Sequence, residues 1–210
     1  MERYIPSIEA AMREALDATE AATADLFADG DLSLYGMLRY HLGWANPDFS
    51  IADSDGGKRI RPLVCVLACL ASGGDAEAAI PTAAAIELLH NFTLIHDDVQ
   101  DRSLTRRHRR TVWSLYGEGQ AINAGDAMFA ISQLPLLGSS TGSPAIPAET
   151  VIKLSRAFNE TVLRIVEGQV LDLGFEDRWD INAADYQRMI RGKTATLVSF
   201  AAWAGSTIAG

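Results

Sequence analysis

The stretch from Leu94 to Trp113, LIHDDVQDRSLTRRHRRTVW, places acids and bases side by side. Three aspartates come first (Asp97, Asp98 and Asp101), and five arginines follow within nine residues. Clustered carboxylates repel one another unless a cation lies between them, and clustered guanidinium groups attract anions. The pattern therefore indicates a metal ion held beside a phosphorylated ligand.

Two of these aspartates have the spacing of metal ligands on a helix. Asp97 and Asp101 are four residues apart and share a helical face, whereas Asp98 is turned by about 100° toward the site edge or a neighbouring cation. Magnesium uses one or two carboxylates together with substrate phosphates. The alternative is a solvated acidic helix end. The apolar approach from Phe92 to Ile95 weighs against it, because it indicates a partly buried helix.

Two basic groups are candidates for holding the anion. The first is a run of four arginines: Arg106, Arg107, Arg109 and Arg110. Their planar forks suit phosphate oxygens, although a solvated basic loop is the usual fate of such a run. The second group, GGKRIRP (56–62), opens a predicted helix, where Lys58 and Arg61 can share a face and the helix N-terminus attracts anions. Two anion sites beside a carboxylate pair indicate two phosphorylated substrates and a metal.

Polar residues also occur within otherwise apolar helical segments. His90 lies two turns before Asp97, where a lone histidine is more often a satisfied core residue, and His96 is assigned a structural role. Gly125 costs a helix about 1 kcal/mol, which close helix packing would explain.

Two polar pairs interrupt helical stretches nearer the C-terminus. Gln169 and Asp172 lie on neighbouring turns of an apolar helix, and Lys193 and Thr194 lie near the start of the last one. Buried polar groups need partners, so both pairs indicate a lined cavity instead of a dry core.

Composition limits the class of protein. The 210 residues are 48% hydrophobic and 21% charged, which is typical of a globular protein, and the net charge of −9 argues against a general nucleic-acid binder. MERYIPSIEA lacks the apolar core of a secretory signal, and the apolar run 62–71 is about half of what a bilayer crossing needs. Cys65 and Cys69 are expected to be buried thiols in a reducing cytoplasm, because no second pair completes a metal site.

The expected fold is all-α: a single domain over 1–210 that forms one bundle of long helices around a central cavity. Helices are predicted at 7–28, 32–44, 62–72, 76–98, 120–137, 148–173 and 183–209. Pro81 is expected in the first turn of its helix. Loops are predicted at 46–57, 102–110 and 138–147, and no segment has useful strand-like alternation.

Six motifs in order resemble those of the trans-isoprenyl diphosphate synthases, the polyprenyl synthetase family. They are GGKRIRP (56–62), ELLHNFTLIHDDVQD (87–101), RRHRRTVW (106–113), INAGDA (122–127), GQVLDL (168–173) and GKTATL (192–197). The resemblance implies the isoprenoid synthase fold, a homodimer, and a transferase that condenses isopentenyl diphosphate with an allylic diphosphate.

The resemblance also implies a role for each motif. Mg²⁺ would bind the first aspartate-rich motif, with Asp97 and Asp101 as ligands, and would carry the allylic diphosphate. Arg106 would contact that diphosphate. Lys193 and Thr194 would steady the same diphosphate from the opposite wall. The residues that match the family's isopentenyl diphosphate site are Lys58, Arg61, His90 and Arg107. Gln169 and Asp172 match the polar motif of the facing helix.

Product length in this family depends on residues just before the first aspartate. Phe92 is aromatic, Thr93 is small, and Leu89 lies one turn deeper. This pattern resembles synthases that make geranylgeranyl diphosphate more than those that make farnesyl diphosphate.

Two departures from the family pattern affect these expectations. Arg110 stands where the family usually has proline. The second aspartate-rich motif should follow the KT helix, and the sequence ends at Gly210 before reaching it, so we expect missing C-terminal helices and a truncated or impaired form. The alternatives are a terpene cyclase-like relative, against which Lys58, Arg61 and His90 argue, and a binding subunit without turnover.

Overall fold

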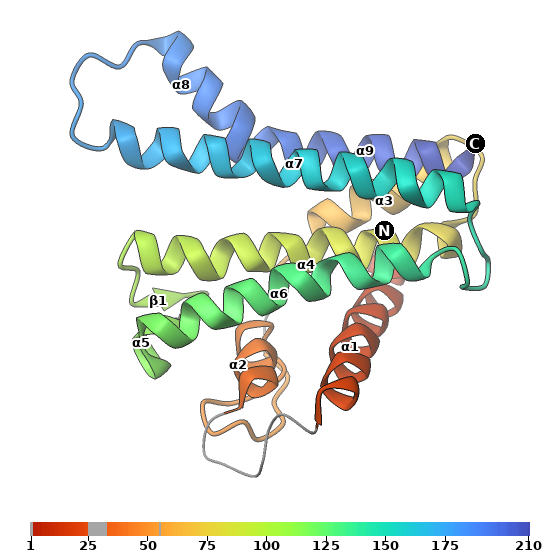
Figure 1. Ribbon diagram of the computed structural model, residues 1–210, viewed down its shortest axis with the longest axis horizontal. Coiled ribbons are helices and arrows are strands. Elements are labelled where there is room, and N and C mark those ends of the chain that lie inside the picture. The colour runs from red at the N-terminus through yellow and green to blue at the C-terminus, as the bar shows by residue number, and fades with distance from the viewer. Residues whose placement is uncertain (1, 25–32, 55) are drawn as a thin grey trace. The chain divides into compact units, whose positions relative to one another are not determined.

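The computed structural model describes residues 2–24, 33–54 and 56–210, and this part of the chain divides into two compact units. The first unit contains residues 2–60 and 84–135, and the second contains residues 61–83 and 136–210. Helices make up most of both units (Figure 1).

The first unit places two long helices beside a short hairpin. It contains most of α4 (Ala76–Gln100) and of α6 (Glu118–Gly138), together with the 3₁₀ turn η1 (Glu2–Tyr4), α1 (Ile5–Ala22), α2 (Leu34–His41), α5 (Val112–Tyr116), β1 (Thr105–Arg106) and β2 (Arg109–Arg110). Gly125 allows α6 to approach α4 closely, because a Cβ there would lie 2.1 Å from Nε2 of His96. The predicted close packing at Gly125 is therefore confirmed.

The second unit is built on a helix pair that lies side by side in Figure 1, α7 (Ala148–Phe175) and α9 (Thr196–Ala209). Phe158 and Phe200 meet edge to face, with ring centroids 5.7 Å apart. The unit also contains α3 (Ile60–Ala71, from Arg61), the start of α4, α8 (Ala183–Ile190) and the π-helical turn η3 (Arg191–Ala195). Cys65 and Cys69 are free and buried, as predicted, and burial raises the pKa of both thiols.

Several predicted helix boundaries are wrong. The first helix ends at Ala22, before the predicted 28, because Thr23 leaves the helical conformation; residues 25–28 lie outside the described part. The second runs only from Leu34 to His41, because Ser33 caps its start and Gly43 has a φ of +87°. Pro81 lies inside α4, five residues past its start, and not in the first turn.

Two further differences concern local structure. The segment 102–110, predicted to be a loop, contains the antiparallel hairpin β1–β2. The last predicted helix is interrupted at 191–195 by η3. By length and composition α4 could cross a membrane, but most of its apolar window is buried within the protein, as expected for a core helix.

Candidate functional site

The three aspartates lie at the C-terminal end of α4. The helix ends at Gln100, and the backbone N–H of Asp101 donates to the carbonyl of Asp97 over 2.8 Å. Asp97 is partly buried and Asp101 is exposed. Because the C-terminal end of a helix carries a partial negative charge, it adds to the attraction of these carboxylates for a cation.

Asp98 is buried and is already paired with an arginine. Its side chain is 2% exposed, and it accepts bonds from Nε of Arg106 at 2.9 and 3.0 Å and from Nη2 at 2.8 Å. Burial raises the pKa of the Asp98 carboxyl, and the bonds from Arg106 oppose that rise. Asp98 is therefore turned toward a neighbouring cation, which is one of the two orientations predicted from its spacing.

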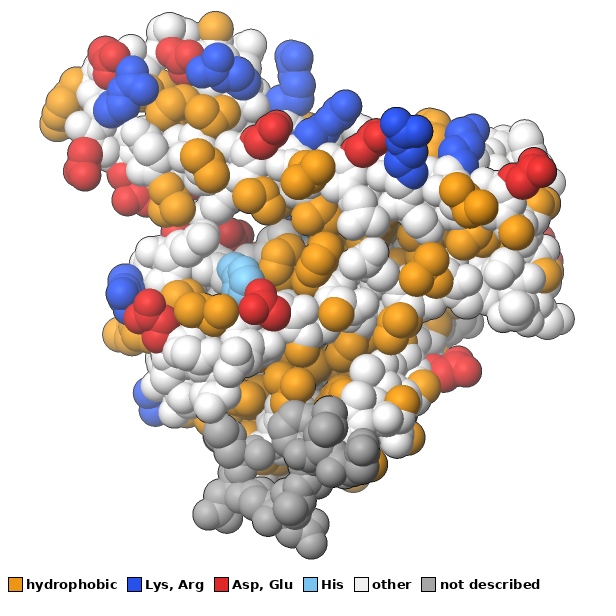
Figure 2. Space-filling view, in the orientation of Figure 1, with side chains coloured by type: hydrophobic (Ala, Val, Ile, Leu, Met, Phe, Trp, Pro, Cys, Tyr) orange, Lys and Arg blue, Asp and Glu red, His pale blue; other side chains and the backbone are white. Residues whose placement is uncertain are grey.

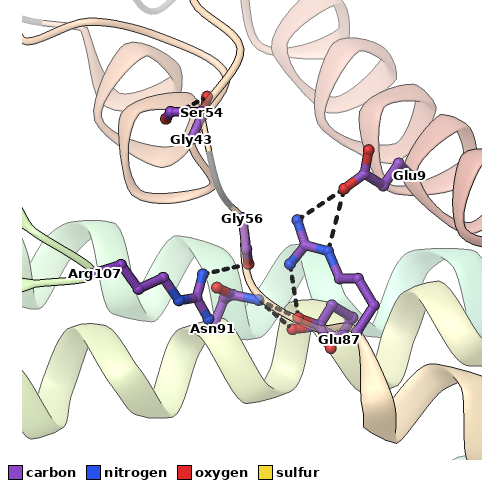
Figure 3. A network of polar contacts seen from close by, with 8 residues as sticks. Glu9, Gly43, Ser54, Gly56, Glu87, Asn91 and Arg107 are labelled. Carbon is purple, nitrogen blue, oxygen red and sulfur yellow. Dashed lines mark hydrogen bonds and ion pairs between the residues drawn. The ribbon is translucent and has the colours of Figure 1, made fainter.

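The hairpin between β1 and β2 presents the next two cations. Arg106 pairs with Arg109 in register, so Arg107 and His108 form a two-residue loop. Both loop residues have positive φ, +50° and +62°, as a type I′ turn requires. Arg107 donates from Nη1 to the carbonyl of Gly56 (Figure 3). The sharp turn thus directs Arg106 to Asp98 and Arg107 to the loop that carries Lys58.

The other arginines of the run have structural partners. Arg109 donates to the carbonyls of Tyr40 at 3.0 Å and Ala45 at 2.6 Å, and its guanidinium lies 4.2 Å from the Tyr40 ring centroid. Arg110 donates to the Ser114 carbonyl. Both guanidinium groups therefore have hydrogen-bond acceptors within the protein.

A small cavity of about 20 Å³ lies among the arginines of the first unit. Its lining comprises Tyr40, His41, Asp98, Arg106, Arg107, Arg109, Arg110 and Thr111. Nε2 of His41 is buried and has no hydrogen-bond partner among the described residues. Burial, followed by repulsion from Arg107 and Arg106, lowers the pKa of His41 to about 3, so the imidazole is neutral. His41 has no predicted role, since nothing in its spacing distinguishes it in the sequence.

The basic loop differs from its predicted geometry. Because α3 begins at Ile60, Lys58 precedes the helix, and the prediction that Lys58 and Arg61 share a helical face is wrong. Lys58 is exposed, whereas Arg59, which has no predicted role, is 2% exposed.

His90, which is predicted to bind isopentenyl diphosphate, and the residues predicted to set product length lie close together along α4. His90 is partly buried, and its carbonyl accepts a bond from Oγ1 of Thr93 at 2.8 Å. The Phe92 ring lies 5.2 Å from that of Phe129, and Leu89 is fully buried.

The second unit contains the remaining predicted residues. Nζ of Lys193 donates to Oδ2 of Asp172. The close approach of the two segments at Gly168 allows this contact, because a Cβ on Gly168 would lie 2.1 Å from the Lys193 backbone nitrogen. Gln169 is buried on the same helix, whereas Thr194 is exposed.

The family of this chain follows from comparison with known proteins. A model of the polyprenyl synthetase family matches residues 49–210. The chain belongs to the polyprenyl synthetase family. It is 40% identical over 174 residues to the (2E,6E)-farnesyl diphosphate synthase of Mycobacterium tuberculosis, covering 83% of this chain and 46% of the relative. It is 43% identical over 184 residues to the geranylgeranyl diphosphate synthase of Sulfolobus acidocaldarius, covering 88% of this chain and 52% of the relative.

Solved structures of polyprenyl synthetases agree with this membership. A polyprenyl synthetase from Streptomyces coelicolor A3(2) matches with a TM-score of 0.85 at 32% identity, covering 100% of this chain and 57% of that one. A geranylgeranyl pyrophosphate synthetase from Pyrococcus horikoshii matches with a TM-score of 0.73 at 31% identity, covering 99% and 58%. The prediction of an all-α isoprenoid synthase fold is therefore confirmed. The chain spans about half the length of the curated relatives it matches.

The donor set at the end of α4 fits the magnesium expected of a polyprenyl synthetase. Within the described residues, no group of three or more His, Cys, Asp or Glu is gathered to hold a metal by itself. Asp98 is bonded to Arg106, and Asp97 and Asp101 lie one helical turn apart. Two carboxylates suit magnesium when the ligand's phosphates supply further oxygens.

Each unit therefore brings some of the predicted site residues into contact with one another. Asp98 and Arg106 are in contact, Arg107 reaches the loop of Lys58, and Asp172 meets Lys193. The binding roles of all these side chains stay predictions.

Proposed function

We propose that this polyprenyl synthetase is a Mg²⁺-dependent prenyltransferase that condenses isopentenyl diphosphate with an allylic prenyl diphosphate to give a short-chain product such as geranylgeranyl diphosphate. One observation supports this above all. Asp97 and Asp101 lie one turn apart at the end of α4, and Arg106, which is held by the buried Asp98, follows in β1. Relatives named prenyl diphosphate synthases add to that support.

Asp97 and Asp101 would hold the magnesium beside the allylic diphosphate. When bound, the metal supplies positive charge that stabilises the diphosphate as it leaves. Arg106 would add to that stabilisation. Its bonds to Asp98 use Nε and Nη2, so Nη1 is the nitrogen that would donate to an anion.

Further cations would bind the second diphosphate. Lys58, Arg61, His90 and Arg107 match the family's isopentenyl diphosphate site. Lys193 and Thr194 would steady the allylic diphosphate, next to Gln169 and Asp172. Lysine and arginine donors aimed at the phosphates in advance would stabilise the charge that develops there without costly reorganisation.

The reaction exchanges one carbon–oxygen bond for one carbon–carbon bond. The allylic C–O bond breaks, and its electron pair leaves with the diphosphate. The double bond of isopentenyl diphosphate then attacks the allylic cation, and the released diphosphate takes the proton, so no protein base is required. An apolar, water-poor environment protects the cation until that attack.

The test is a labelled assay with matched variants. Purified protein, Mg²⁺, labelled isopentenyl diphosphate and dimethylallyl, geranyl or farnesyl diphosphate should give a longer prenyl product. Asp97→Asn should remove nearly all of it, whereas Glu14→Gln, which changes an exposed acid on α1, should not. Binding of both diphosphates without turnover would favour a binding subunit. Loss of diphosphate from the allylic substrate alone would favour a cyclase-like relative.

Product length tests the positions before Asp97. The Phe92 ring contacts Phe129, and Leu89 is buried below it on α4. If Phe92 limits chain growth, Phe92→Ala should lengthen the product seen by mass analysis. An unchanged chain length would refute this role.

A homodimer is part of the same proposal. Large hydrophobic side chains are exposed along α7, including Ile152, Leu163 and Val170, and Figure 2 shows hydrophobic side chains on this helix. A second copy that covers them would be stabilised by apolar burial. Sedimentation equilibrium tests this, and a monomer at all concentrations would refute it.

A further inference from the structure

A buried ion pair lies directly behind the exposed Lys58. Nη1 of Arg59 donates to Oε1 of Glu87 over 2.7 Å, and the two side chains are 1% and 3% exposed. Nε and Nη2 of Arg59 also donate to Oε1 of Glu9, each over 3.2 Å. Arg59 thus joins the loop to α4 through Glu87 and to α1 through Glu9, both of which are labelled in Figure 3. Losing one partner would leave a buried charge unpaired, so this contact is strongly constrained.

The backbone of Arg59 is held in an unusual conformation. Its φ is +50°, in the left-handed region, and Gly57 two residues earlier has a φ of +100°. A left-handed non-glycine residue costs about 1 kcal/mol or more and persists only where the surroundings fix it. The bonds to Glu87 and Glu9 offset that cost. The result is an inward Arg59 next to an outward Lys58.

The two glycines of the loop lie against guanidinium groups. A Cβ on Gly56 would lie 2.4 Å from Nη2 of Arg59, and a Cβ on Gly57 would lie 2.6 Å from Nη2 of Arg107. Arg107 also donates to the Gly56 carbonyl. The loop is therefore held from one side by Arg59 and from the other by Arg107, and any larger residue at 56 or 57 would displace one of them.

The carboxylate that holds Arg59 is itself held in place. Nδ2 of Asn91 donates to Oε1 of Glu87 at 3.2 Å and to its carbonyl at 2.8 Å. Asn91 is fully buried and follows His90 on α4. The network from Asn91 through Glu87 to Arg59 thus connects the helix of His90 to the loop of Lys58.

We propose that Arg59 is a positioning residue for diphosphate binding at this loop. Its buried pair with Glu87 fixes the conformation in which Lys58 faces outward and Arg107 is bonded to Gly56, so the loop is arranged before a ligand arrives. Preorganisation of this kind increases affinity, because the cost of ordering the loop is already met on folding. The identity of the diphosphate rests on the proposed function, whereas the positioning itself does not.

The test measures binding without turnover. Inorganic pyrophosphate is titrated into the full chain by calorimetry, so the result does not depend on prenyl transfer. Arg59→Gln should weaken binding by about tenfold, because the loop would then have to be ordered when the ligand binds. Arg59→Lys, which keeps the charge, should recover part of the affinity. Where Arg59→Gln does not fold, Arg59→Lys and Glu87→Gln carry the same comparison.

The matched control is Arg39→Gln. Arg39 also bonds two carboxylates, Asp17 at 2.7 Å and Glu20 at 2.6 Å, but it does so near the surface of α2. This control should leave pyrophosphate affinity unchanged. A merely structural Arg59 would lower the urea midpoint while folded protein binds pyrophosphate as the parent does, and that result would overturn the proposal.

A double-mutant cycle separates positioning from general weakening. If Arg59 acts through Lys58, Arg59→Gln should cost little affinity when Lys58→Gln is already present. Full additivity of the two losses would overturn the proposal. In a turnover assay, Arg59→Gln should raise the KM for isopentenyl diphosphate and leave that for the allylic substrate nearly unchanged. If the parent chain shows no turnover but Arg59→Gln still loses pyrophosphate binding, the proposed function is refuted and the positioning role stands.

Discussion

The two units each contain an acid–base pair, and the pairs are held in different ways. In the first unit, Asp98 is 2% exposed and Arg106 bonds it through two nitrogens. In the second unit, the side chains of Lys193 and Asp172 are 24% and 34% exposed and share a single contact. The first pair is fixed by its own hydrogen bonds, and its carboxylate is buried away from solvent. The second is set by the backbone crossing that brings its helices together. Backbone changes should therefore matter most in the second unit, and charge changes in the first.

The largest expected effect is that of Gly168→Ala in the second unit. The new Cβ would lie 2.1 Å from the backbone nitrogen of Lys193, and backbone cannot move away as a side chain can. The free energy of unfolding should fall by about 3 kcal/mol in urea denaturation. Gly174→Ala on the same helix is the control, since nothing lies within 4 Å of its Cβ, and it should stabilise by about 0.5–1 kcal/mol. Equal effects at both glycines would contradict the close crossing.

Arg106→Met should have the next largest effect, in the first unit. It leaves the buried Asp98 carboxylate without its guanidinium, at an expected cost of about 2 kcal/mol in the free energy of unfolding. Arg102→Met, which removes the exposed pair with Glu118 at 2.7 Å, should cost far less. Similar losses in the two variants would show that burial of Asp98 does not distinguish the first pair.

The burial of His41, followed by its repulsion from the arginines around it, should also make the stability of the protein depend on pH. The pKa of His41 is about 3 in the folded protein and near 6.5 when unfolded, so the unfolded state binds more protons between these values. Stability should therefore fall as the pH drops below 6.5, by at most about 1.4 kcal/mol per pH unit. His41→Gln should remove this contribution, whereas His108→Gln, on the exposed hairpin loop, should keep it. Parallel pH profiles for the parent and His41→Gln would contradict it.

The smallest effect is expected for Asp172→Asn in the second unit. Because both partners are partly exposed, the loss in unfolding free energy should be about 0.2–1 kcal/mol and should shrink at high salt. A double-mutant cycle with Lys193→Met measures the coupling. A coupling as large as the cost of Arg106→Met would remove the contrast between the two pairs.

Much of the fold follows from local pattern. The long apolar helices at 76–98 and 148–173 were predicted within a few residues, because their apolar periodicity is strong and no later contact overrides it. The end of the second helix, predicted at 44, lies at His41 instead, because Gly43 has a φ of +87°, which the pattern of apolar residues does not show. The π-helical turn has no pattern of its own in the sequence.

The site was predicted in composition but not in pairing. Acids and arginines in one stretch indicated an anion and metal site, yet the sequence could not show that Arg109 is bonded to the carbonyls of Tyr40 in α2 and of Ala45 after it. The Arg59–Glu87 pair likewise joins residues far apart in the chain. Such pairings depend on which helices meet, and only the tertiary structure determines that.

The π-helical turn η3 fixes the phase of α9. A π-helical turn accommodates one more residue than an α-helical turn, and one residue corresponds to about 100° of rotation. Lys193 lies within η3 and faces Asp172, and Phe200 on α9 meets Phe158 on the same neighbouring helix. In a relative that lacks one residue in 191–195, a different face of the last helix would turn toward α7, so a single-residue gap here would change which side chains meet without changing the order of the helices.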